Sequence, residues 1–383
     1  MSTAQIIDGM DPRSGRSLRV TVVGERIAQI EERAEICEFL LAPGLIDLQV
    51  NGSGGLDLNA EDVSAEIVMA LTERMLQQGV TSFVPTLISA REDKICHGLD
   101  VIAQARRLSP RAAACIPYVH VEGPHLSPRD GYRGAHDAAF IRPPSIAEFD
   151  RWCPAADCLV GMVTLSPHDA QAPAYIAHLV QHGVRVALGH TDASAEQIHR
   201  AVEAGARLST HLGNGLAAEL PRHRNPLWAQ LADDRLTATV IADGHHLPAE
   251  FLQVVVRSKG VGNVVLISDS VALAGMAPGD YVTPVGGLVT LHADGRLCVA
   301  GTELLAGSTA SLSQCVADMM RLTGLSLAEV LPMATSQPGR FVYGRGAMRV
   351  GARADLLRFR WKAGMEIDAV WLRGERVYAR AGE

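Results

Sequence analysis

The chain has 383 residues and a formal net charge of −7, because 35 Lys and Arg stand against 42 Asp and Glu. That balance excludes the basic face of a nucleic-acid-binding protein, and 48% hydrophobic against 20% charged residues excludes wholesale disorder. No stretch has the roughly 20 uninterrupted apolar residues of a membrane helix, and the first residues lack the basic-then-apolar pattern of a signal peptide. We therefore expect a soluble, cytoplasmic protein with no nucleic-acid and no membrane partner.

The seven cysteines are scattered along the chain and form no Cys-x-x-Cys pair. This pattern argues against a disulfide framework and against a thiolate zinc site. We expect a reducing compartment.

Both ends of the chain alternate short apolar runs with turns, at 17–23, 26–30 and 37–41 and again at 355–360, 369–373 and 376–379. Such runs are typical of antiparallel strands. Because chain termini commonly lie close together, we predict that residues 1–43 and 341–383 form one small β-sandwich domain.

The middle of the chain has a different rhythm, in which short apolar runs alternate with amphipathic segments. Strands buried on both faces by helices read as such uniformly apolar runs. The runs are 45–50, 80–86, 116–121, 159–165, 184–188, 206–209, 238–242 and 264–267, and the helical patterns include 61–78, 92–107, 170–182, 194–204 and 311–321. A Gly-rich insertion at 275–301 looks like a hairpin. The alternation predicts a (β/α)₈ TIM barrel over residues 44–340.

Polar side chains follow four of these runs, where the C-terminal ends of barrel strands converge on one mouth. Glu122, His190 and His211 offer one carboxylate and two imidazoles, a set typical of catalytic zinc with a position open for water. Asp269 would stand near that water as proton acceptor and donor.

Each residue alone has an ordinary structural explanation. A histidine at a strand end commonly satisfies a hydrogen bond, Glu122 could accept backbone N–H groups, and Asp269 could cap the following segment. All four residues, however, stand at the same position of the repeated pattern, just after a predicted strand, and this favours the metal site. The roles of His125 and His168, in loops at the same mouth, stay open.

Several motifs in order resemble the N-acetylglucosamine-6-phosphate deacetylases of the amidohydrolase superfamily, over nearly the whole chain. They include 42–52 (APGLIDLQVNG), 120–124 (HVEGP), 189–191 (GHT), 210–212 (THL), 241–244 (IADG), Ser268 with Asp269, 305–308 (LAGS) and 354–356 (ADL).

The resemblance implies that Glu122, His190 and His211 hold the metal and that Asp269 is the general acid and base. It also implies that His246 polarises the acetyl carbonyl and stabilises the oxyanion.

The resemblance further implies contacts to the sugar phosphate by Gln49, Asn51, His136, Asn214, Arg224 and Ser308. His136 matches a phosphate-contacting histidine, and Arg224 an arginine that reaches into the neighbouring subunit's site, which implies a homodimer. A solvated loop pair is the ordinary alternative for these two residues.

The metal implied is a single divalent ion, with zinc first and other divalent ions possible. Gln49 and Asn51 stand where other amidohydrolases have His-x-His for a second metal, and no lysine follows the fourth strand. These features disfavour a two-metal cyclic-amide hydrolase.

The chain departs from the family in the loops expected to form the sugar and phosphate pocket. It has Gly213-Asn214-Gly215-Leu216 in place of an aromatic-Asn-Ala-Met run, Arg224-Asn225-Pro226 in place of Arg-Glu-Pro, and His245 beside His246. The expected function is removal of acetyl from N-acetylglucosamine-6-phosphate. The alternatives are the same chemistry on another N-acyl compound, or a barrel that binds an amino sugar without turnover.

Overall fold

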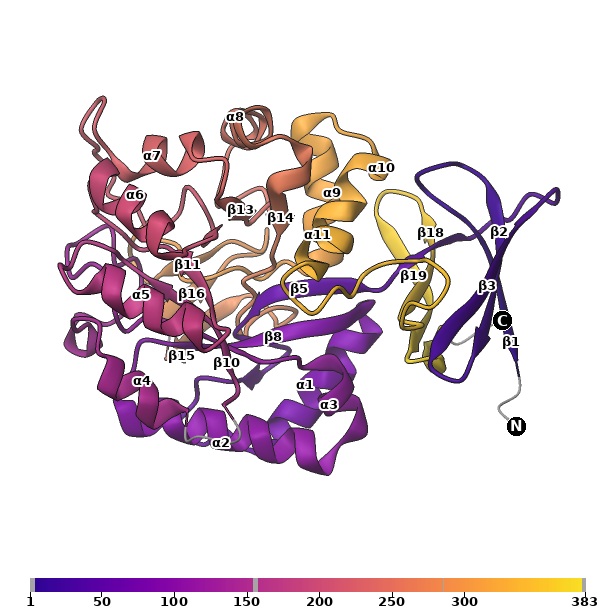
Figure 1. The fold of residues 1–383 in the computed structure, drawn as a ribbon, viewed down its shortest axis with the longest axis horizontal. Coiled ribbons are helices and arrows are strands. Elements are labelled where there is room, and N and C mark those ends of the chain that lie inside the picture. Colours follow the sequence, from indigo (N-terminus) through magenta and orange to yellow (C-terminus); the bar gives the residue numbers. More distant parts are fainter. Residues whose placement is uncertain (1–3, 154–157, 285, 381–383) are drawn as a thin grey trace.

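The fold is that of a computed structural model, which describes residues 4–153, 158–284 and 286–380. Eight strands form one parallel sheet in chain order, and a parallel bridge between Val50 and Ser270 joins its two ends (Figure 1). The strands are β5 (Leu45–Val50), β8 (Val80–Ile88), β9 (Val119–Glu122), β10 (Val160–Leu165), β11 (Arg185–Leu188), β12 (Leu208–Ser209), β13 (Thr237–Val240) and β14 (Val264–Leu266). Each lies within or close to a predicted apolar run, and the predicted barrel is confirmed.

Helices surround the barrel and cover the outward side of the strands (Figure 1). They are α1 (Ala65–Gln77), α2 (Glu92–Leu108), α3 (Pro110–Cys115), α4 (Ile146–Trp152), α5 (Ala172–Gln181), α6 (Ala195–Ala204), α7 (Pro226–Ala232), α8 (Ala249–Lys259), α9 (Leu312–Thr323), α10 (Leu327–Val330) and α11 (Ser336–Gly339). Helix α6 shows how the sequence sets the bounds: Ser194 and Gln197 form a capping box at its start, and Gly205 ends it in a left-handed conformation. Among the residues described, no helix has the length and apolar character needed to cross a bilayer.

Two layers of apolar side chains hold the barrel together. The inner layer fills the barrel with residues such as Ile46, Val84 and Ile267, all 1% exposed or less. The outer layer packs strands against helices, as Leu71 of α1 and Val255 of α8 do. Since side chains fill the interior, the barrel is a packed core and its chemistry must lie at an end.

The two chain ends form one seven-stranded sheet beside the barrel, in the order β20-β19-β18-β4-β1-β2-β3 (Figure 1). Its strands are β1 (Gln5–Met10), β2 (Ser17–Val23), β3 (Arg26–Arg33), β4 (Leu40–Pro43), β18 (Leu356–Trp361), β19 (Met365–Leu372) and β20 (Glu375–Ala379). The sheet folds over its own core, since Val22 and Ile27 cluster with Leu356 and Trp371. This is the predicted sandwich built from both termini.

The Gly-rich insertion forms a small antiparallel sheet of β15 (Gly279–Thr283), β16 (Gly287–Leu291) and β17 (Leu297–Val299). One strand more than the predicted hairpin is present, because the chain turns back a second time through 292–296. Another two-stranded pair, β6 (Gly52–Ser53) and β7 (Leu56–Asp57), follows the first barrel strand.

Two of the seven cysteines are bonded to each other, a pairing that the scattered spacing did not predict. Cys153 and Cys158 form a disulfide, while Cys37, Cys96, Cys115, Cys298 and Cys315 are free thiols. The spacing of five residues carries no motif, and only the fold brings the two Cα atoms to 4.4 Å.

Asp47 of β5 is a carboxyl group buried between the barrel and its helices. Its Oδ1 accepts the backbone N–H groups of Gln49 and Ser268, while Oδ2 has no hydrogen-bond partner among the described residues. Burial raises the pKa of Asp47 to about 6. The folded state therefore binds this proton more tightly than the unfolded chain, so its contribution to stability is present at low pH and is lost as the pH rises through about 6.

Substituting Asp47→Asn removes this ionisation while keeping the shape of the side chain. We expect the free energy of unfolding of the variant, relative to the parent, to rise by about 2 to 3 kcal/mol between pH 4 and pH 8. Urea unfolding across this range, with chelator in every sample, measures the difference. A difference that does not change with pH would show that Asp47 is not the titrating group.

Candidate active site

The backbone bends sharply where three of the predicted site residues leave their strands. His190 follows β11 with φ +48°, His211 follows β12 with φ +30°, and Asp269 follows β14 with φ +48°. Left-handed backbone at residues other than glycine costs about 1–3 kcal/mol each and clusters at functional sites. At these positions it accompanies side chains that enter the barrel mouth, where all three line one pocket.

Glu122, the last residue of β9, is the centre of the arrangement. Its Oε1 lies 2.9 Å from Nε2 of His211 and 3.4 Å from Nε2 of His190, and all three residues are buried. Burial alone would raise the pKa of Glu122, but the hydrogen bonds and charge of the two imidazoles lower it well below the usual range. Glu122 therefore stays an anion, and a cation can take the place between the three groups.

The orientation of His190 is set from behind. Its Nδ1 lies 3.0 Å from the carbonyl oxygen of Tyr132, which can only accept, so Nδ1 carries the proton. Nε2, the nitrogen that faces Glu122, is therefore the one available to bind a metal ion.

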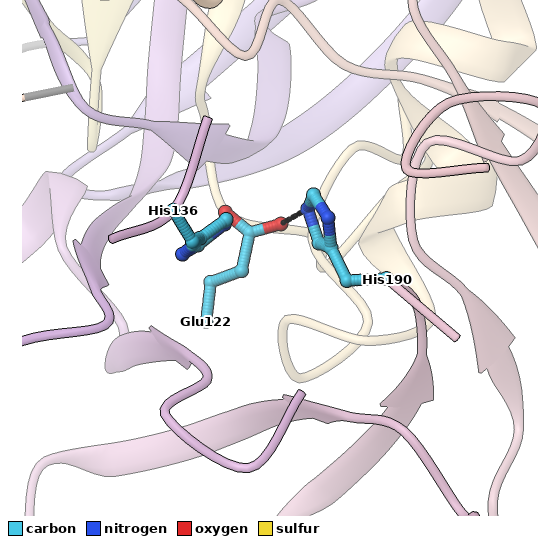
Figure 2. Close-up of side chains that lie close together, drawn as sticks. All are labelled: Glu122, His136 and His190. Atoms are coloured by element: carbon cyan, nitrogen blue, oxygen red, sulfur yellow. Dashed lines mark ion pairs between the residues drawn. The ribbon is translucent and has the colours of Figure 1, made fainter. Parts of the chain in front are cut away.

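His136 also belongs to this cluster. Figure 2 shows its ring beside Glu122 and His190, and one ligand atom from each of these three residues lies within 4.8 Å of the others. The rings of His136 and His190 have centroids 4.5 Å apart. Burial and the neighbouring His190 lower the pKa of His136 to about 3, so its imidazole is neutral. The residues able to hold an ion thus include His136 besides the predicted set.

Asp269 lies in the same pocket and is held by Asn51, the residue that follows β5. Asn51 donates from Nδ2 to Oδ1 of Asp269 at 2.8 Å. Burial and the negative charge of Glu122 raise the pKa of Asp269 to about 8. A carboxyl group with such a pKa can take up and release a proton near neutral pH.

His246 is held by the carboxylate of Asp243, which was not among the predicted site residues. Its Nδ1 lies 2.7 Å from Oδ2 of Asp243, whose Oδ1 accepts the backbone N–H groups of His245 and His246 at 2.9 Å. Although burial opposes it, the contacts with His246 lower the pKa of Asp243. Asp243 thus holds the ring that lines the pocket.

These groups share one pocket of about 240 Å³. Among the six predicted substrate contacts, Asn51, His136 and Asn214 line it. Gln49 and Ser308 are buried and do not line it: Nε2 of Gln49 has no partner among the described residues, and Oγ of Ser308 accepts the N–H of Ala310. Arg224 lies on an exposed loop away from the pocket.

The contacts of His125 and His168, two further histidines predicted at the mouth, set them apart from the site residues. The ring of His125 is stacked on Trp152, and its Nδ1 lies 3.2 Å from the carbonyl oxygen of Arg142, which is a packing role. His168 lies 2.7 Å from Ser166 Oγ and does not line the pocket.

No sequence pattern indicates that His136 approaches the metal ligands, because His136 lies in a loop and not at a strand end. The loop is tied down by Ser127, whose N–H donates to the carbonyl of His190 at 3.0 Å. Asp243 could have been found from its spacing, since a carboxylate three residues before His246 can bond both its ring and its backbone.

Comparison with known proteins places this site in a family. The model of the Amidohydrolase family matches residues 40–377. N-acetylgalactosamine-6-phosphate deacetylase of Escherichia coli O157:H7 is 34% identical over 88% of this chain and 87% of its own, and human N-acetylglucosamine-6-phosphate deacetylase is 31% identical over 91% and 86%. The chain belongs to the amidohydrolase family, among the N-acetylglucosamine-6-phosphate deacetylases.

Solved structures agree with this assignment. N-acetylglucosamine-6-phosphate deacetylase from Thermotoga maritima superposes with a TM-score of 0.87 at 26% identity, covering 98% of this chain and 100% of its own. A substituted form of the Mycobacterium smegmatis enzyme, solved with N-acetyl-D-glucosamine-6-phosphate, gives 0.86 at 28% identity, covering 98% and 99%.

The geometry leads to a prediction about which histidines bind a metal ion. We expect Glu122→Gln and His211→Asn to weaken zinc binding at least about 100-fold, because each removes a ligand atom at the shared position. His136→Asn should keep one equivalent of zinc, since Glu122, His190 and His211 remain. Chelator competition measures the affinities, with Leu216→Ala as a control on the pocket wall. If His136→Asn lost zinc and His211→Asn kept it, His136 and not His211 would be the metal ligand.

Proposed function

We propose that this chain is a metal-dependent hydrolase that removes the acetyl group from N-acetylglucosamine-6-phosphate, giving glucosamine-6-phosphate and acetate. The observation that carries the proposal is the meeting of Glu122, two imidazoles and the carboxyl group of Asp269 in one pocket. The relatives named for this deacetylation, and the Mycobacterium smegmatis structure with the phosphorylated sugar, support the choice of substrate.

The residues present fit one divalent ion. Nε2 atoms of His190 and His211 converge on one oxygen of a buried, ionised Glu122, which is the one-carboxylate, two-imidazole donor set of catalytic zinc. We propose zinc as the resident ion, although this donor set also accepts other divalent metals. Gln49 and Asn51 offer amides where a second ion would need imidazoles, so we propose a single ion.

Asp269 moves the proton in the proposed reaction. When bound, the ion polarises the acyl carbonyl and makes a water molecule more acidic. Asn51 occupies Oδ1 of Asp269 and leaves Oδ2 to accept the proton of the attacking water. The same carboxyl then protonates the leaving amine, so that the C–N bond breaks to a neutral amine and acetic acid, which loses its proton to solvent as acetate.

The two pocket histidines outside the predicted ligand set act on the substrate. His246, with Nδ1 held by Asp243, directs its other nitrogen to the acyl carbonyl and stabilises the oxyanion. His136 was predicted to contact the phosphate, but its neutral ring lies against His190. The phosphate is a dianion at the far end of the sugar, whereas His136 is neutral and lies beside the metal ligands. We therefore assign His136 to the acyl end of the substrate.

Phosphate recognition in this proposal requires a second copy of the chain. Within the described residues, no lysine or arginine lines the pocket. Arg224 lies on an exposed loop with Arg222 and His223. We propose that it reaches the pocket of a neighbouring subunit. We therefore propose a cytoplasmic homodimer in which Arg224 binds the phosphate across the interface.

A second candidate substrate is N-acetylgalactosamine-6-phosphate, favoured by the relative at 34% identity that is named for it. The two sugars differ only at one hydroxyl, so they can be compared in parallel with zinc-loaded protein by release of acetate. We expect turnover of a 6-phosphorylated sugar at least about tenfold above unphosphorylated N-acetylglucosamine. Turnover of neither phosphate ester would redirect the search to another N-acyl compound.

The substitution Asp269→Asn tests whether the chain is an enzyme. An amide cannot shuttle the proton, so we expect kcat to fall by about 10³-fold while zinc stays bound. Asp234→Asn, on the exposed surface, is the matched control and should behave as the parent. Unchanged hydrolysis in the Asp269 variant would contradict the mechanism, and no hydrolysis in any variant or the parent would favour a binding protein.

The role of Arg224 predicts a change in KM with little change in kcat. Arg224→Ala should raise KM for the phosphorylated sugar about 10- to 100-fold, because one charge-assisted contact is lost, and should leave the unphosphorylated sugar unaffected. Arg200→Ala, an exposed arginine of α6, is the control. Light scattering that shows a monomer under assay conditions would remove this role.

A further inference from the structure

A second pocket lies at the opposite end of the barrel from the active site. Its volume is about 270 Å³, close to the lower bound of roughly 300 Å³ for small-molecule sites. It is formed where the segment 343–355 runs from the barrel toward β18, and by Arg26 of β3. Figure 1 shows the segment before β18 passing between the barrel and the sheet of terminal strands.

The location follows from the strand ends that the pocket residues touch. Arg345 donates to Oγ of Ser82, near the start of β8. Ile88, at the other end of β8, lines the active-site pocket. At about 3.3 Å per residue the two ends of this strand lie about 20 Å apart. A ligand in this second pocket therefore would not compete with substrate for space.

The pocket walls carry a large excess of positive charge. Four arginines line it, Arg26, Arg345, Arg349 and Arg353, against one carboxylate, Asp355. In a chain of net charge −7 this local excess is not a property of the whole surface.

The single carboxylate is already engaged. Asp355 is buried, pairs with Nε of Arg353 at 2.5 Å and accepts the N–H of Arg373 at 2.8 Å. Arg345 has no ion-pair partner within the described part of the chain and bonds only neutral oxygens, those of Ser82 and Ala114. Arg349 is exposed, and its side chain has no hydrogen bond to any described residue.

The positive charges also act on one another. Burial and the nearby Arg353 lower the pKa of Arg345 to about 10. The guanidinium of Arg185 lies 5.2 Å from the ring centroid of Tyr343, a residue of the pocket wall. Cations held together in this way, without a free acidic partner, gain from an anion that neutralises them.

We propose that this pocket binds a small phosphate-bearing anion. Arginine forks match the oxygens of a phosphate with paired hydrogen bonds, and exposed Arg26 and Arg349 can close on a ligand whose base rests on Arg345. The site is separate from the deacetylation pocket, and its occupancy is measured by binding and not by turnover.

The test is calorimetric titration of the full-length, zinc-loaded protein with inorganic phosphate at low ionic strength. The variant R26Q/R349Q removes two exposed arginines of the pocket, and R200Q removes one exposed arginine elsewhere as a control. Any phosphate binding in the active site is common to all three proteins. We expect R26Q/R349Q to weaken one class of phosphate site at least about tenfold and R200Q to leave it within about twofold.

Two outcomes would overturn the proposal. If R26Q/R349Q binds phosphate as the parent does, the pocket is not an anion site. If R200Q weakens binding as strongly, the effect is one of overall charge. Melting temperature and circular dichroism check the fold of each variant. R349Q alone replaces the double variant if that protein is unstable, because the Arg349 side chain bonds to no other described residue.

Discussion

The site depends on one buried carboxylate that stays ionised. Glu122 faces imidazoles of His190 and His211, and their hydrogen bonds outweigh the cost of burying its charge. Together with burial, the same negative charge raises the pKa of Asp269 to about 8, so Glu122 both creates a place for a cation and brings the neighbouring carboxyl into the range where it can take up and release a proton. A neutral residue at 122 would remove both properties together.

The barrel positions the residues around Glu122 where its first and last strands meet, which we call the closing seam. β5 and the end of β14 meet through the bridge from Val50 to Ser270 and the bond from the Asp269 N–H to the Gln49 carbonyl. This seam sets Asn51 beside Asp269. Strained backbone at His190, His211 and Asp269 is tolerated because the apolar interior beneath them fixes each strand. Stability is thus concentrated in the barrel, and reactive groups are concentrated at one of its ends.

The sequence predicted the barrel and the strand-end residues well, because buried parallel strands leave a clear apolar pattern and their ends share one direction. What it missed lies in contacts between segments far apart in the chain. The loop that brings His136 to His190, the burial of Ser308 away from the pocket lining and the Cys153–Cys158 bond all depend on loop paths that have no periodic signal. The positive charge of the second pocket likewise could not be predicted from the sequence, because it depends on Arg26 lying beside the segment 343–355.

The most direct test of this account is anomalous diffraction at the zinc edge from crystals of the zinc-loaded protein. We expect one strong peak at the barrel mouth, bonded to Glu122, His190 and His211, with Asp269 facing the open side. A peak elsewhere, or no peak at these residues with full zinc content in solution, would contradict the claim that Glu122 organises the site.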